Sequence, residues 1–212
     1  MATLALVATG CGDDGGADEL RSGLPPAPTS VADGCRQADE AVSFTVLCPT
    51  GWPENVRPSR TTLRMLGETD EAYLLEDNTG FGSRSPVFHV LLGGQHEPFP
   101  STFEGGGKRL RVTTRRVVTP YYASPRGGRV LGHRVVERPT RRVATTHVRG
   151  QHAAIMKAPP YPHGGIHGAH MIVMWNENGH GYLVSAHSER SPRAATMAAL
   201  RIARSSQPLP DR

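Results

Sequence analysis

The sequence predicts an α+β domain, with a mainly antiparallel sheet and a C-terminal helix packed on one face of it. Two observations predict this class. Short runs rich in β-branched and aromatic residues recur along the chain and are separated by glycine- and proline-rich segments. The last such runs form a hairpin pattern followed by an amphipathic helical pattern, and strands and helices do not alternate along the chain.

The hairpin spans residues 170–186. The apolar run 170–175 predicts a strand covered on both faces, with even-numbered residues on one face and odd-numbered residues on the other. Asn178 and Gly179 predict a tight turn because both residue types tolerate positive φ. Residues 181–186 then return as the second strand.

The helix that follows is marked at both ends. Ser191 is a favoured N-cap, and Pro192 is tolerated at the first helical position because the N–H that it lacks has no partner there. Gln207-Pro208 ends the helix. At 3.6 residues per turn, one face collects small and apolar residues that suit close packing on a sheet. These are Ala195, Ala198, Ala199 and Ile202.

The remaining strands are predicted from residue type. They lie at 42–47, 71–76, 86–92, 109–118, 129–137 and 141–157. Gly93-Gly94 should end the strand at 86–92, and Gly150 should break the last one. Residues 97–108 and 159–168 are rich in glycine and proline and are predicted to be loops.

The start of the chain resembles an export signal. Residues 1–10 are apolar and uncharged, and Val7-Ala8-Thr9-Gly10-Cys11 resembles a bacterial lipobox, which predicts lipidation at Cys11. No Lys or Arg precedes the apolar run, so we expect the signal peptide to be truncated, with the true start upstream. The alternative is a short, disordered cytosolic N-terminus.

The cysteines agree with export. The chain has three, and lipidation of Cys11 leaves Cys35 and Cys48 as a pair that predicts a disulfide in an oxidising compartment. Two free thiols in a cytosolic protein are the alternative. Residues 11–34 are predicted to be a disordered tether, residues 35–208 one domain, and residues 209–212 a tail.

The distribution of net charge along the chain indicates which classes of partner to expect. The net charge is +5, and the first 34 residues, with five acidic residues and one arginine, carry −4, so the rest carries +9. The basic residues alternate with Val and Thr in strand-like runs, which is typical of solvated strand faces rather than a nucleic-acid surface. We therefore expect no nucleic acid, and instead a membrane anchor at Cys11 with an anionic envelope polymer or protein as partner.

No catalytic motif and no cofactor motif is recognisable, so no catalytic residue is predicted and the chain is not expected to be an enzyme. The one chemically suggestive pattern is a group of histidines around the hairpin. Neutral imidazole is a common metal ligand, and three can hold zinc with an open position. The candidate ligands are His163, His167, His170, His180 and His187.

Scattered motifs resemble a family of uncharacterised envelope lipoproteins of high-GC Gram-positive bacteria, which carry a domain of unknown function. The most specific is the hairpin pattern Trp175-x-Glu177-Asn178-Gly179-x-x-Tyr182, followed by a helix. Weaker matches are residues 49–53, 89–94, 148–150 and 202–205. The resemblance implies an antiparallel sheet with a C-terminal helix, an extracytoplasmic location and no established enzyme activity.

Together these features predict a non-catalytic, membrane-anchored domain of the cell envelope that binds a partner or ligand. The alternative is a histidine-rich, metal-binding or metal-dependent extracytoplasmic protein.

Overall fold

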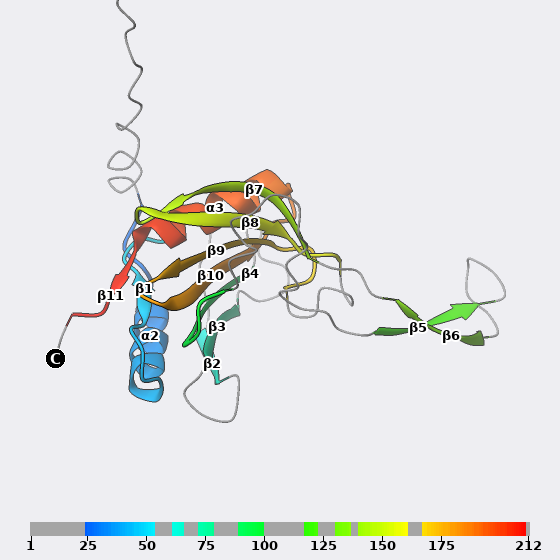
Figure 1. Cartoon of the computed structure of the whole chain (residues 1–212), viewed down its shortest axis with the longest axis horizontal. Helices are drawn as coiled ribbons and strands as arrows, with labels where there is room; N and C mark the ends of the chain where they lie inside the picture. Colours follow the sequence, from blue (N-terminus) through cyan, green and yellow to red (C-terminus); the bar gives the residue numbers. More distant parts are fainter. Residues whose placement is uncertain are drawn as a thin grey trace, which may run out of the picture.

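The computed structural model describes residues 24–53, 61–65, 72–78, 89–99, 117–122, 130–136, 140–160 and 167–210 (Figure 1). It confirms the predicted class, because a mostly antiparallel sheet is covered by a C-terminal helix. Seven antiparallel strands form the main sheet in the order β2-β3-β4-β10-β9-β8-β7. In sheet order they are Thr61–Met65, Ala72–Asn78, His89–Gln95, His180–His187, Met171–Glu177, Gln151–Lys157 and Arg141–Val148.

Two smaller sheets accompany it. β1 (Leu47–Pro49) pairs with β11 (Ser206–Pro208), and β5 (Val117–Tyr122) pairs with β6 (Val130–Val136). In Figure 1 the β5–β6 hairpin lies apart from the seven-stranded sheet. The β1–β11 pair was not predicted from the sequence, because three-residue strands leave no periodic pattern to read.

Both helices cover one face of the main sheet. α2 (Thr29–Ala41) packs on β1, β2 and β3, and α3 (Pro192–Ser205) packs on β9 and β10. The predicted face of α3 is buried, and Ser191 caps it by accepting a hydrogen bond from the backbone N–H of Ala194. The two faces of β9 also divide as predicted. Met171, Val173 and Trp175 join the core under the helices, and Ile172 and Met174 belong to a second apolar cluster on the other face.

Helix α2 corrects the predicted tether and the predicted first strand. The sequence analysis placed residues 29–34 in a disordered segment, but they form the first turns of α2, where Val31 and Gly34 are buried. It also placed a strand at 42–47, whereas the strand is Leu47–Pro49. The buried residues Val31, Gly34, Cys35 and Ala38 have helical spacing, but most of them are small. The helix therefore depends on packing more than on its own propensity.

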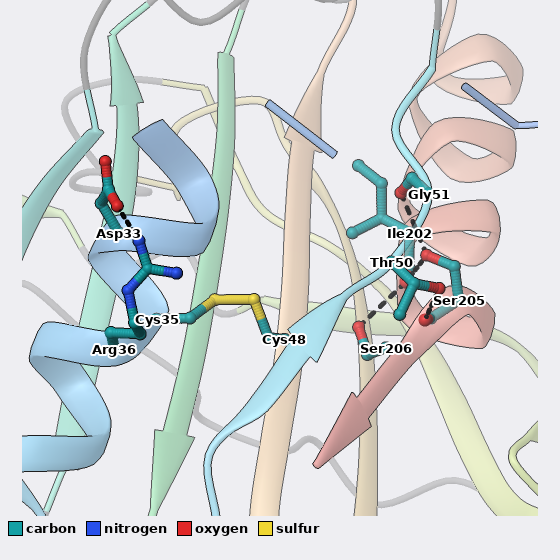
Figure 2. Close-up of a disulfide and its surroundings, with 9 residues drawn as sticks. All are labelled: Asp33, Cys35, Arg36, Cys48, Thr50, Gly51, Ile202, Ser205 and Ser206. Carbon is teal, nitrogen blue, oxygen red and sulfur yellow. Dashed lines mark hydrogen bonds and ion pairs between the residues drawn. A yellow bond between two sulfur atoms is a disulfide. The ribbon is translucent and has the colours of Figure 1, made fainter. Parts of the chain in front are cut away.

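The predicted disulfide is present and fastens this helix (Figure 2). Cys35 on α2 is bonded to Cys48 on β1, with their Cα atoms 5.8 Å apart. Beside it, the Thr50 hydroxyl donates to the Ser205 carbonyl at 2.8 Å, and the Ser205 hydroxyl donates to the Gly51 carbonyl at 3.0 Å. The segment after α2 is thus joined to the end of α3.

Two glycines that were predicted to break a strand lie inside one. Gly93 and Gly94 are both paired within β4, and Gly94 stands opposite Tyr73 on one side and Tyr182 on the other. A Cβ at Gly94 would lie 2.6 Å from the Tyr73 ring. Gly94 therefore makes room for an aromatic ring, a Cβ at Gly93 would lie 3.2 Å from the Leu74 side chain, and the strand continues to Gln95.

Both well-defined hairpins turn on two residues with positive φ. Asn178 and Gly179 have φ of 52° and 84° between β9 and β10, and Arg149 and Gly150 have φ of 53° and 79° between β7 and β8. Asn-Gly was predicted for this role. Arg149 is an uncommon residue there, and its guanidinium is held by both carboxylate oxygens of Glu177 and by the Ser206 carbonyl.

Within the described ranges, neither helix is long and apolar enough to cross a membrane. The predicted signal-like segment 1–10 and Cys11 lie outside the described residues. Ala27 and Leu209 both pack against the main core, so the domain begins before Cys35 and extends one residue past the predicted end at 208.

Candidate functional site

The face of the sheet turned away from the helices carries a group of polar side chains at one end of the central strands. Four are histidines, and we call them the histidine cluster: His89, His167, His170 and His187. The Ser185 hydroxyl lies between two of them. Glu76 on β3 lies beside the cluster, with an oxygen 3.4 Å from Nε2 of His89.

Strand register places these residues together. His89 on β4 is the direct partner of His187 on β10, so their side chains start from adjacent positions on the same face. Ser185 precedes His187 by two residues and therefore shares this face. His170 immediately precedes β9, and its ring centroid lies 5.1 Å from that of His89 and 5.5 Å from that of His187.

Backbone hydrogen bonds fix the segment that carries His167 and His170. The His170 N–H donates to the His167 carbonyl at 3.0 Å, and the His170 carbonyl accepts from the Ala158 N–H at 3.0 Å. The Ala169 N–H donates to the Pro159 carbonyl at 2.9 Å. The turn before β9 is thus tied to the end of β8, which sets the direction from which both imidazoles enter the cluster.

The Ser185 hydroxyl constrains the protonation of two rings. Its Oγ is 2.8 Å from Nδ1 of His167 and 2.8 Å from Nδ1 of His170. A hydroxyl donates only one proton, so one of these nitrogens accepts from Ser185 and the other donates to it. When both rings are neutral they are opposite tautomers, and the ring that donates at Nδ1 keeps a lone pair on Nε2.

A hydrogen bond to the backbone of Ser185 opposes the lowering of the pKa of His170 by burial. In the tautomer in which His170 donates through Nδ1, Ser185 donates its own proton to His167 and the Nε2 of His170 keeps a lone pair.

Burial keeps the cluster uncharged. It lowers the pKa of His167 to about 4 and that of His170 to about 2, with the neighbouring imidazoles adding to both shifts. Burial also lowers the pKa of His89, and the attraction of Glu76 opposes this without reversing it. The pKa of His187 is lowered by burial, while a hydrogen bond to the backbone of Gly168 works in the opposite direction. At neutral pH all four rings are neutral, which is the form that binds metal ions.

Three of the five predicted metal ligands meet in this cluster. His167, His170 and His187 are brought together, whereas His180 lies elsewhere, with its Nδ1 2.6 Å from the His96 carbonyl and its ring against Phe44. His163 lies outside the described residues. In the present rotamers no three His, Cys, Asp or Glu side chains of the described part of the chain already form a group able to hold a metal ion.

Sequence reasoning missed His89 and Glu76. Both lie far along the chain from the hairpin, in strands that were predicted but whose partners were not. The sequence feature that could have indicated the site is His89 itself, the single polar residue within the apolar run at 86–92. Such a histidine on an otherwise apolar strand needs a polar neighbour across the sheet.

No family model matches the chain, and no curated protein or solved structure shows significant similarity to it. What the domain does is therefore inferred from its own residues.

Proposed function

We propose that the chain is a non-catalytic, lipid-anchored lipoprotein domain of the bacterial cell envelope, held outside the cytoplasm at Cys11. The disulfide is the observation that carries this proposal. Cys35 and Cys48 are both buried, at 0% and 7% exposure, and join α2 to β1. Structural disulfides persist in oxidising compartments and are rare in the cytosol, which supports export.

The remaining cysteine supports an anchor. Of the three cysteines, only Cys11 is outside the disulfide, and it stands at the end of the lipobox-like run. This arrangement also favours kinship with the high-GC Gram-positive envelope lipoproteins that the hairpin motif resembles. Lipidation at Cys11 would leave a polar, acidic segment between the lipid and the folded domain.

The chemistry of the cluster favours binding over catalysis. Ser185 is the hydroxyl group nearest to the imidazoles, but it is 0% exposed and its Oγ is shared between two Nδ1 atoms. A serine nucleophile needs its oxygen open to the substrate and a single base positioned to take its proton. Ser185 instead fixes the orientation of the two rings.

Exposed arginines supply a surface for an anionic envelope partner. Arg193 and Arg201 lie on the outer side of α3, and Arg141 is exposed on β7, which is the last strand of the main sheet. Binding of an anionic polymer to such a surface should weaken steeply as salt is added, because exposed charges are screened over about 10 Å at 0.1 M ionic strength.

The test is the intact mass and N-terminal sequence of the protein extracted from its native host, measured with and without reductant. We expect a diacylated N-terminus at Cys11 and a mass gain of about two daltons on reduction, from the two thiols that form. An unprocessed N-terminus together with free thiols at Cys35 and Cys48 would overturn the proposal.

A further inference from the structure

We propose that the histidine cluster is a binding site for a divalent transition-metal ion of the zinc, copper or nickel type, with His89, His170 and His187 as ligands. The inference goes beyond the proposed function, because it names a ligand for the domain. It also replaces the ligand set expected from the sequence. His89 is added, His180 is removed, and His167 becomes a neighbour of the ligands, while His163 lies outside the described residues.

The three ligands come from adjacent strands. β4, β10 and β9 are consecutive in the sheet, and His89 and His187 are direct cross-strand partners. His170 occupies the position just before β9 and faces the same side. The three imidazoles are thus carried by neighbouring central strands or, for His170, by the residue just before one, which suits a site that must hold a fixed geometry.

The spacing of the rings fits one ion. With metal–nitrogen distances of roughly 2.1 Å and tetrahedral angles, two ligating imidazoles have ring centroids about 5 Å apart. The observed centroid separations from His170 are 5.1 Å to His89 and 5.5 Å to His187. The two ring pairs that include His170 therefore have the separation expected for a metal site, although the described side chains do not form a group able to hold an ion as they stand.

Rotation about χ2 is the movement that the site requires. This terminal torsion is broad in histidine, so the rings of His89 and His187 can turn without leaving their strands. The Nε2 atom of His89 is buried and lies 3.4 Å from a carboxylate oxygen of Glu76, so turning this ring changes a long contact with that carboxylate. His170 can stay in place in the tautomer that donates through Nδ1 to Ser185, because its Nε2 then carries a lone pair.

The surroundings resemble the outer shell of a metal site. Histidine ligands commonly use their second nitrogen to bond a carboxylate, hydroxyl or carbonyl that fixes the ring. Here Ser185 serves His170, the backbone of Gly168 serves His187, and Glu76 lies 3.4 Å from Nε2 of His89. The apolar cluster that includes Ile172 and Met156 lies on the same face. His89 and His187 are only partly buried, which leaves an entry route on their side.

Imidazole ligands select the metal class. Neutral imidazoles favour zinc, copper, nickel and iron over magnesium and calcium, which prefer oxygen ligands. Three protein ligands leave a fourth position open to water or to a bound molecule.

The experiment uses the purified full chain with its disulfide intact. Zn²⁺, Ni²⁺ or Cu²⁺ is added to metal-free protein, and bound metal is measured by elemental analysis after dialysis, with thermal unfolding in parallel. We expect one ion per chain and a higher Tm with these ions, and neither with Mg²⁺ or Ca²⁺. His170→Gln and His187→Gln should abolish stoichiometric binding, and Ser185→Ala should weaken it about tenfold to a hundredfold while one ion still binds at saturation.

Two other histidine pairs provide matched controls. His147 and His152 are cross-strand partners on β7 and β8 with ring centroids 4.5 Å apart, and His96 and His180 lie 5.3 Å apart. His152→Gln and His180→Gln should bind metal like the wild type. Binding that is lost in either control but retained in His170→Gln would overturn the proposal, and so would the absence of a stoichiometric ion in folded wild-type protein.

Protein folding is checked for each variant by circular dichroism. If His170→Gln fails to fold, His89→Gln decides the question, because His89 is only partly buried and tolerates replacement better. Full metal binding by folded His89→Gln would also overturn the proposed ligand set. A negative metal result leaves the N-terminal mass experiment unaffected, so failure of this inference and failure of the proposed anchor are distinguishable.

Discussion

Reduction of the Cys35–Cys48 disulfide should lower the free energy of unfolding by about 3 kcal/mol. The two cysteines are 13 residues apart in sequence, and a cross-link that closes a loop of about this size removes that amount of conformational free energy from the unfolded chain. This loss of stability should appear first as unfolding of α2. This helix has no side-chain hydrogen bond at its N-cap, no acidic residue in its first turn and no basic residue in its last.

Little else compensates for the lost bond. Besides Cys35, the buried side chains of α2 are Val31 and Ala38, and Gly34 adds no side chain. Reduction should therefore release α2 before the main sheet unfolds, since α2 contributes only Val31, Cys35 and Ala38 to the shared apolar core, and α3 and the central strands supply most of the rest. Local release of this kind lowers hydrogen-exchange protection in α2 while protection in β9 and β10 persists.

The assay is urea unfolding of the purified chain with and without reductant, with thiol content checked by mass. The matched control is the double variant Cys35→Ala, Cys48→Ala, whose unfolding curve should not respond to reductant. A wild-type protein that keeps its midpoint when both thiols are shown to be free would refute the view that the disulfide stabilises this domain.

Three further predictions concern other contacts. Burial lowers the pKa of His167 from 6.5 to about 4, so the contribution of this group to stability is complete above pH 6.5 and is lost as the pH falls towards 4. The free energy of unfolding of the metal-free protein, measured by urea titration, should fall by about 2 kcal/mol from this group by pH 5. The same measurement on His167→Gln should show a smaller fall. Gly94→Ala should lower Tm, with a cost of roughly 1–3 kcal/mol, because the added Cβ meets the buried Tyr73 ring at 2.6 Å; thermal unfolding as stable as wild type would contradict this. Arg149→Met should cost about 3 kcal/mol in urea unfolding because it leaves the Glu177 carboxylate, 12% exposed, without its cation, and adding Glu177→Gln should recover part of the loss.

The C-terminal half of the fold was predictable because its signals are local. Ser191 and Pro192 mark a helix start by their own chemistry, and Asn178-Gly179 fixes a turn through the φ values that these residues tolerate. The disulfide was predictable by counting cysteines. The α2 helix was missed although Val31, Cys35 and Ala38 have helical spacing, because the segment also contains Asp and Gly and its stability comes from contacts with distant strands. The β1–β11 pair was missed because three-residue strands leave no periodic pattern in the sequence.

The continuous strand through Gly93 and Gly94 was missed for a related reason. Glycine in isolation reads as a break, since it lacks a side chain to pack and loses the most entropy on folding. In the sheet, the absence of a side chain at Gly94 makes room for Tyr73, whose ring stacks on Phe44 at a centroid distance of 6.0 Å. The aromatic neighbours supply the packing that the glycine does not, and this compensation is visible only when the register is known.

The candidate site shows most directly that strand register cannot be read from the sequence. Closeness in sequence grouped His180 with His187 because both belong to one strand, but they lie at opposite ends of β10, and only His187 reaches the cluster. His89 is about a hundred residues away in sequence and stands directly opposite His187. A site built across strands is specified by register, and register depends on which strands are neighbours. The histidine-rich segments therefore predict a candidate site, whereas the members of the proposed site follow only from the order β4-β10-β9.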